Sequence, residues 1–567
     1  MQVRIRISVG PRQAGAPLRR QSGREPSSLL IEEQPRLAKP EKPTAALGAS
    51  SRVALGILIS RITGLLRQSV FAHYFGASSV ADAFTAAVRI PNTLNNLFGE
   101  GVLSASFITV YSRLRARGDD EAAKRLAAAI FGLLAVVCSV LVLIGVSAAP
   151  LLVDVIAFGF QAERRALTIH LVRILFPGTA MLVMSAWCLG VLNSHRRFLL
   201  SYTAPVAMNV VMIGCLTMFG SGAAQERLAT DLAWAFVLGS VLQFLVQVPR
   251  VLQLLPDFRP SFETRSNDVK TVVRNFGPIF MSRGVVQLSA FVDSIIASEL
   301  PNGAVAALGY GQTVALLPIS LFSMSVSAAE LPALSSAVGT EDEVAAFLRK
   351  RLSAGLRRIA FLIVPSAAAF LLLGDVISGA LFQSGKFGHR EAVWQWGILA
   401  GSAVGLLASG FGRLFSSCYY ALLDTKTPLR FATIRVILTT VLGVLFSLPL
   451  PHWLGIDPRW GVAGLTASAG IAGWVEFVLL RRGLAQKIGA VSISGTYMSK
   501  LWAMALSAGV IGYFAKLGLG SIHPRIVAAV VLPLFGIVYL GGTAILDVQE
   551  SKAFISTVRR RLGLGGS

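Results

Sequence analysis

The sequence has 567 residues, of which 54% are hydrophobic and only 14% are charged, and its mean hydropathy is +0.65. Soluble proteins contain about 25% charged residues, so this composition excludes a string of soluble domains and indicates a membrane protein. The formal net charge of +23 at pH 7 fits either nucleic-acid binding or membrane topology. The positions of the basic residues decide between the two.

Residues 1–50 differ from the rest of the chain. They are rich in Pro, Ser, Arg and Glu and show no periodic apolar pattern, which predicts a disordered basic cytoplasmic tail. The start of the chain has no apolar core or cleavage site of a secretory signal. Two alternatives stay open: a tether to anionic lipids, or an upstream start codon, so that this segment is not translated.

Long apolar stretches separated by short loops fill the sequence from residue 53 to residue 547. Stretches without any charged residue include 126–153, 198–225, 304–329 and 526–546. Each reaches the ~20 residues that a helix needs to cross a ~30 Å hydrocarbon core. About fourteen such stretches are present, and they predict an all-α polytopic membrane protein with about fourteen transmembrane helices.

Lys and Arg gather in every second loop, for example in residues 113–125, 250–274 and 349–358. This alternation is the positive-inside signature. It predicts that these loops and both termini are cytoplasmic and that the intervening loops are periplasmic, in a bacterial inner membrane. Two predicted periplasmic loops are exceptions and carry a basic pair each, Arg164 with Arg165 and Lys386 with Arg390. Topology thus explains the charge, and nucleic acid is not an expected partner.

The second predicted span contains a polar stripe. In an ideal helix, Arg89, Asn92, Asn96 and Glu100 fall on one face over about half the membrane thickness. Ionisable groups inside a membrane cost several kcal/mol unless they face protein or a water-filled cavity. We interpret the stripe as a substrate-binding surface. The alternative is a structural network that holds helices together.

Further arginines lie in the first and seventh predicted spans. The first carries Ser60, Arg61 and Arg67, and the seventh carries Arg283 and Asp293. A guanidinium stays charged and offers a planar fork that suits phosphate oxygens. These residues predict a cavity for an anionic, phosphate-bearing substrate.

Enzymatic and cofactor signatures are missing from the sequence. The four cysteines, Cys138, Cys188, Cys215 and Cys418, have no metal-ligand spacing, and no Walker motif for a nucleotide is found. We therefore predict neither a metal nor a cofactor. Transport would draw on an ion gradient or the membrane potential, with Asp82, Glu100 and Asp293 as candidate carboxylates for ion coupling.

Several motifs resemble the MurJ/MviN family of the MOP exporter superfamily. They are Ser60–Arg67, Phe75–Ala77, Asp82–Phe84, Arg89–Asn92, Phe98–Gly101 and Tyr420–Pro428. Members of this family flip lipid II, the undecaprenyl-pyrophosphate-linked peptidoglycan precursor. The resemblance implies two six-helix lobes around a cationic cavity, and two extra C-terminal helices that form a groove for the lipid tail. The expected parts are an N-terminal lobe over 51–256, a C-terminal lobe over 257–490, the extra pair over 491–550 and a cytoplasmic tail over 551–567.

The resemblance also assigns site residues. It implies that Arg61, Arg67 and Asp82 are important for activity and that Ser60 and Glu100 line the cavity. The chain departs from the family at two places: Asn95 stands where a cavity arginine is expected, and Gln312–Thr313 stands where an Asp-Arg pair is expected. We predict that Arg89 and Arg283 supply the missing positive charge.

The predicted function is that of a lipid II flippase working by alternating access, and not of an enzyme. Membrane lipids and the cell-wall synthesis machinery are the expected partners besides the substrate. Four alternatives remain: a flippase for another polyprenyl-linked glycan, a drug or cation antiporter, a transferase acting on polyprenyl phosphate, and a non-transporting cell-wall scaffold.

Overall fold

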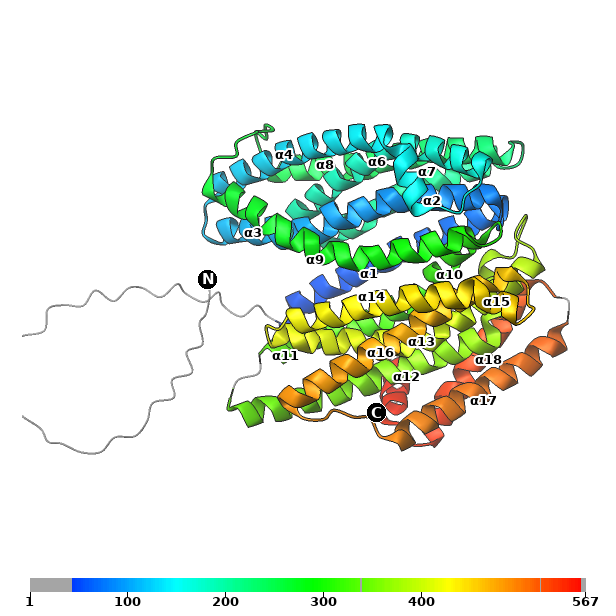
Figure 1. Ribbon diagram of the computed structural model, residues 1–567. Coiled ribbons are helices and arrows are strands. Elements are labelled where there is room, and N and C mark those ends of the chain that lie inside the picture. The colour runs from blue at the N-terminus through cyan, green and yellow to red at the C-terminus, as the bar shows by residue number, and fades with distance from the viewer. Residues whose placement is uncertain (1–42, 337–338, 521, 562–567) are drawn as a thin grey trace, which may run out of the picture. The chain divides into compact units, whose positions relative to one another are not determined.

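The computed structural model in Figure 1 describes residues 43–336, 339–520 and 522–561. The chain separates into two compact units, Met1–Gly48 and Ala49–Ser567, and the second unit is considered below. Of the predicted disordered tail over residues 1–50, residues 1–42 lie outside the described ranges. The prediction is wrong for residues 43–50, which form the start of α1. Within those ranges every named element is a helix.

The helices have the following bounds. They are α1 (Pro43–Phe75), α2 (Ser79–Leu94), η1 (Asn95–Ile108), α3 (Thr109–Ala116), α4 (Asp120–Ser147), α5 (Ala149–Ile156), α6 (Ala162–Ser194), α7 (Phe198–Phe219), α8 (Gln225–Leu254), α9 (Asn267–Ser298), α10 (Ala304–Pro318), η2 (Ile319–Ser323), α11 (Met324–Ser335), α12 (Glu341–Phe382), α13 (His389–Ala421), α14 (Lys426–Ser447), α15 (Pro449–Trp453), η3 (Pro458–Trp460), α16 (Gly461–Ile488), α17 (Gly495–Leu519), α18 (Pro524–Ile545) and α19 (Gln549–Arg561).

The prediction of an all-α polytopic membrane protein is confirmed. Among the described residues, 11 helices are long and apolar enough to cross a membrane. Three other predicted spans, in α1, in α2–η1–α3 and in α9, are also helical but are not among those 11. These three carry the arginines that the sequence analysis singled out. The total of about fourteen transmembrane helices therefore stays a prediction.

Most helix contacts lie within the first or within the later part of the unit, and a few connect the two parts. In the first part of the unit, α6 packs against α2, α4 and α8, and α7 packs against α8. In the later part, α13 packs against α12 and α16, and α14 packs against α16. Helix α9 contacts both η1 and α14, and α10 contacts α2, so these pairs connect early and late segments. The last two long helices, α17 and α18, pack on each other and on α12 (Figure 1).

Two helices contain π-helical segments, where the backbone widens. They are η1, which follows α2, and η2, which follows α10 directly after Pro318. A π-helix bonds residue i to i+5, so it has more residues per turn than an α-helix. The single-face stripe predicted for Arg89 to Glu100 is therefore wrong in its second half, because ideal α-helical spacing ends at Leu94.

Candidate functional site

Asp82 joins α2 to the start of α10. Its carboxylate is fully buried and accepts hydrogen bonds from the backbone N–H groups of Gly303 (2.7 Å) and Ala306 (2.8 Å). Free N–H groups at a helix N-terminus favour a negative charge. Asp82 thus caps α10 from another helix, at the end of the molecule that the loop charges assign to the periplasm. We call this end the outer end.

Arg164 and Arg165 are one of the two basic pairs that depart from the positive-inside pattern, and each of them forms an ion pair. Arg164 contacts the Asp82 carboxylate at 3.3 Å, and its guanidinium lies 4.5 Å from the ring centre of Phe160. Arg165 binds Asp154 through two bonds of 2.5 and 2.9 Å. Both arginines therefore lie beside carboxylates at the outer end.

Backbone and aromatic contacts close the same end. The Tyr310 hydroxyl donates to the Gly76 carbonyl at 2.7 Å, and the Lys386 N–H donates to the His73 carbonyl at 2.8 Å. The Tyr310 ring packs against Phe71, Phe382 and Phe387, with ring centres 5.3 to 6.2 Å apart. Helices α1, α2, α10 and α12 thereby share one buried cluster.

Arg89 lies farther along α2 and contacts one of the positions where the sequence departs from the family pattern. Its guanidinium donates to the side-chain oxygen of Gln312 on α10 at 2.9 Å. The neighbouring Thr313 hydroxyl is turned to its own helix and donates to the Gly309 carbonyl at 2.9 Å. The positive charge of Arg89 thus lies beside α10, at the level where the family arginine is expected.

A second group of charged residues lies around Asp293 on α9. The positive charges of Arg89 and of Arg435 on α14 act on the Asp293 carboxylate. Asp293, Gln312 and Arg435 line one small cavity of about 130 Å³, together with residues of α13, α16 and η2. One oxygen of Asp293 is buried without a hydrogen-bond partner. Sequence reasoning found Asp293 but missed Arg435.

The two arginines of helix α1, Arg61 and Arg67, have different surroundings. Arg61 is exposed and Ser60 is half-buried, whereas the Arg67 guanidinium reaches Met212 Sδ on α7 at 3.6 Å. The Thr63 hydroxyl accepts a bond of 3.2 Å from Asn209 of α7. Helix α1 continues without interruption through Gly64, which lies between Arg61 and Arg67.

The asparagines of the predicted stripe face different surroundings. Asn92 and Asn96 are exposed, while the Asn95 side-chain oxygen is buried without a hydrogen-bond partner. The side chains of Glu100 and Arg283 lie outside the described residues, so their placement in the cavity stays a prediction.

Other charged residues inside predicted spans were missed, although the same search for charges in apolar helices would have found them. Arg435 pairs with Glu476 of α16 at 3.1 Å. Glu330 on α11 is 4% exposed and contacts Arg351 (3.4 Å) and Arg358 (3.2 Å) of α12. These pairs tie helices of the later part of the chain together.

The loop motif around Asp424 has a local structural role. Its carboxylate accepts bonds from Lys487 Nζ (2.6 Å) and from the Thr427 N–H (3.0 Å) and hydroxyl (2.7 Å). The bond from the Lys487 ammonium, helped by those from Thr427, holds the pKa of the Asp424 carboxyl well below its usual range. The contact joins the start of α14 to the end of α16.

An apolar cavity of about 280 Å³ lies where α12, α18 and α19 meet η2. Phe361 and Pro365 of α12, Phe535 of α18, Phe322 of η2 and Phe554 of α19 are among its lining residues. Helix α19 is fixed beside α12 by a two-bond ion pair between Arg357 and Glu550. Segment η2 therefore borders both this cavity and, through Ile319, the one beside Asp293.

Comparisons with known proteins agree with this architecture. The family model described as lipid II flippase MurJ matches residues 71–528. The lipid II flippase MurJ of Burkholderia cenocepacia is 32% identical over 438 residues, which cover 76% of this chain and 82% of that protein. The probable lipid II flippase MurJ of Bdellovibrio bacteriovorus is 31% identical over 436 residues, covering 76% and 80%.

Solved structures with a similar fold include a flippase and a multidrug transporter. The structure titled lipid II flippase MurJ, inward closed conformation, superposes with a TM-score of 0.71 at 22% identity and covers 87% of this chain and 98% of its own. An inward-facing multidrug transporter of the MATE family of the MOP superfamily superposes with a TM-score of 0.60 at 18% identity, covering 77% and 98%. At these identities the likeness describes the fold.

Proposed function

This chain belongs to the lipid II flippase MurJ family, and from that premise we propose that it moves lipid II from the cytoplasmic to the periplasmic leaflet by alternating access. The family match over most of the chain is the observation that carries the proposal. The chain is a multi-pass bacterial membrane protein. Cytoplasmic placement of both termini rests on the loop charges.

The diphosphate of lipid II is proposed to bind arginines on α1 and α2. Arg61 is exposed, Arg67 contacts the soft sulfur of Met212, and Arg89 lies against Gln312. An incoming phosphate oxygen is a stronger acceptor than a thioether or an amide oxygen. These guanidiniums can therefore exchange their present contacts for the substrate, with Ser60, Asn92, Asn95 and Asn96 beside them.

The substitution at Gln312–Thr313 is proposed to be compensated by Arg89. Gln312 orients the Arg89 guanidinium toward α10 by accepting one of its bonds. A cation is thereby supplied near α10 from the neighbouring helix α2. Arg283 is a second candidate: α9 and α10 are in contact, as the short turn between them predicted.

The outer end is proposed to act as the periplasmic gate. In the present conformation α10 begins on Asp82 of α2, and Tyr310 and Lys386 bond to the end of α1. Release of the headgroup to the periplasm requires these contacts to separate. Asp82 would then be left without its two backbone donors, which makes a change in its protonation or partners part of the cycle.

Energy coupling is proposed to involve the buried carboxylates. Asp82, Glu100 and Asp293 are the candidates, and Asp293 shares its cavity with Arg435. The membrane potential contributes about 2.3 kcal/mol per charge per 100 mV to movement of the anionic headgroup. The lipid tail is proposed to stay in the bilayer beside α17 and α18, where the apolar cavity between α12 and α18 would receive part of it.

Complementation tests the function directly. A strain depleted of its own lipid II flippase should grow when it expresses this chain, and lipid II should become accessible to a reagent confined to the periplasm. Arg61→Ala and Arg67→Ala should each abolish rescue at normal membrane levels. Normal growth with no change in lipid II accessibility would favour a scaffold, whereas accessibility of a different polyprenyl-linked glycan would change the substrate.

Topology is tested separately. Reporter fusions at Lys426 and Arg482 should read cytoplasmic, and fusions at Ser78 and Asn302 should read periplasmic. A periplasmic signal at Lys426 would contradict the assignment of the outer end.

A further inference from the structure

The two basic pairs on the predicted periplasmic side have different surroundings. Arg164 and Arg165 each contact a carboxylate, at 3.3 and 2.5 Å. By contrast, neither Lys386 nor Arg390 forms an ion pair with a carboxylate in the described part of the chain. The proposed gate uses the backbone N–H of Lys386, but the proposed function uses the side chain of neither residue. The charge at Arg390 therefore calls for a separate explanation.

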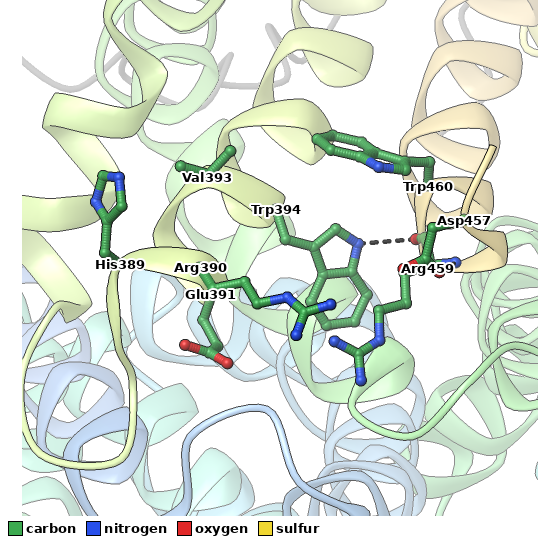
Figure 2. A pocket seen from close by; sticks show the side chains of 8 residues that line it. All are labelled: His389, Arg390, Glu391, Val393, Trp394, Asp457, Arg459 and Trp460. Carbon is green, nitrogen blue, oxygen red and sulfur yellow. Dashed lines mark hydrogen bonds between the residues drawn. The ribbon is translucent and has the colours of Figure 1, made fainter.

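Arg390 lines a pocket of about 370 Å³ between the first turn of α13 and the start of α16 (Figure 2). Its lining residues are His389, Arg390, Glu391, Val393, Trp394, Asp457, Arg459 and Trp460. The Trp394 indole is 7% exposed, and its N–H donates to the Arg459 carbonyl at 2.8 Å. The Trp460 ring lies directly against Gly397, where an added Cβ would come within 2.2 Å of it. The indoles are therefore held in place.

Two guanidiniums converge on this rigid wall. In Figure 2, the side chains of Arg390 and Arg459 extend into the space in front of the Trp394 ring. The Arg459 guanidinium carbon is 5.9 Å from the centre of that ring. Like charges that share one pocket repel each other, and an anion between them removes that repulsion.

The two carboxylates of the pocket are occupied elsewhere. Glu391 accepts a bond of 2.9 Å from the Gly388 N–H and caps α13. Asp457 accepts a bond of 2.9 Å from the Arg459 N–H and caps η3. Neither carboxylate forms an ion pair with Arg390 or Arg459 in the described residues, so both guanidiniums are available to a ligand.

We propose that this pocket binds the phosphate group of a lipid in the periplasmic leaflet. Paired guanidiniums match phosphate oxygens in shape and charge. Tryptophans are enriched at the membrane–water interface, where phosphate headgroups lie. The pocket shares no residue with the proposed transport site, so it is independent of lipid II transport, although its leaflet rests on the predicted topology.

Lipid titration of the full-length protein tests the proposal. The purified chain in a neutral detergent is titrated with phosphatidylglycerol, phosphatidylcholine or inorganic pyrophosphate, and tryptophan fluorescence and the thermal midpoint are recorded. The variants are Arg390→Gln with Arg459→Gln, and the control is Arg525→Gln, another basic residue on the predicted periplasmic side. Phosphatidylglycerol should stabilise the wild type and the control, and its affinity should fall about tenfold or more in the double variant.

The other arms identify the source of the phosphate. Competition by pyrophosphate would support a site that recognises the phosphate itself, and a response to phosphatidylglycerol alone would support a site that needs the lipid. Equal affinity of phosphatidylglycerol for the wild type and the double variant would overturn the proposal. If the double variant fails to fold, the single Arg390→Gln variant gives the same comparison, because this side chain is exposed.

Discussion

Helices α2 and α10 begin in opposite ways, although both start at the outer end and both lead into a π-helical segment. Helix α2 is capped by its own Ser78, whose hydroxyl accepts the Ala81 N–H at 3.2 Å. The N-cap residue of α10 is Gly303, which has no capping side chain and a φ of 92°. Its capping group is Asp82, which belongs to α2.

This difference makes the start of α10 dependent on α2. A self-capped helix keeps its capping bond when its neighbours move, but α10 loses both of its capping bonds if α2 moves away. Gly303 also lies against the Ala77 carbonyl, so closely that an added Cβ would be 2.2 Å from that oxygen. The proposed gate is therefore built on α10, and α2 holds it closed.

Removal of the carboxylate that caps α10 should have the largest effect. Asp82→Ala leaves two helix N–H groups and Arg164 without their buried partner, which costs about 3 to 5 kcal/mol. We expect loss of complementation and a shift of the purified protein toward the outward-open state. The measurements are growth rescue and the accessibility of a cysteine introduced at Gln312. Unchanged accessibility would contradict the role of Asp82 in holding α10.

Removal of the guanidinium that contacts α10 should slow transport strongly, with a smaller effect on folding than Asp82→Ala. Arg89→Ala deletes the cation beside Gln312, and we expect lipid II flipping to fall at least about tenfold, as for loss of a charged hydrogen bond of about 1.5 to 3 kcal/mol.

Arg283→Ala should also inactivate the protein, and adding Thr313→Arg should restore part of the activity. An active Arg283→Ala variant would rule out compensation by that residue. Flipping assays in reconstituted vesicles give these values.

The π-helical segments η1 and η2 provide a second comparison of α2 with α10, away from the helix N-termini. Pro318 lacks a backbone N–H and directly precedes η2, and a proline of this kind disturbs the regular helix. Pro318→Ala should favour a regular α-helix, raise the thermal midpoint and slow flipping several-fold. Pro91→Ala in α2 is the matched variant. A faster rate for Pro318→Ala would contradict a role for η2 in the transport cycle.

Deletion of the self-capping hydroxyl should have the smallest effect. Ser78→Ala removes one N-cap bond, which costs about 1 kcal/mol. Because this bond moves with α2, we expect the thermal midpoint to fall by a few degrees with normal flipping. A loss of flipping as large as that of Asp82→Ala would show that the two caps are equivalent, and the proposed asymmetry would fail.

The sequence predicted the fold well because membrane helices are encoded by length, apolar composition and loop charge. It also singled out Asp82 and Arg89, since charges in apolar helices are rare, and their roles in transport stay predictions. It did not predict what these side chains contact. Periodicity could not show that Asp82 caps a helix whose N-cap residue, Gly303, lies 221 positions later in the chain. A cap supplied by another helix leaves no local sequence pattern.

The departures from ideal geometry were also beyond sequence reasoning. Pro91 and Pro318 indicated disturbed helices, but not that the backbone would widen into η1 and η2. Gly64 shows the opposite case, because α1 continues through this glycine without a break in the helix. Next to it, the Thr63 hydroxyl accepts a hydrogen bond from Asn209 of α7.

Segment η2 has one further consequence, because it forms part of two walls. Ile319 borders the cavity that holds Asp293, and Phe322 borders the apolar cavity beside α18. Occupancy of one cavity that shifts this segment changes the volume of the other. Thermodynamic linkage then requires reciprocity. If a bound tail changes the affinity for the headgroup by some factor, a bound headgroup changes the affinity for the tail by the same factor. A substrate with both parts would bind more tightly, or more weakly, than its separate parts predict.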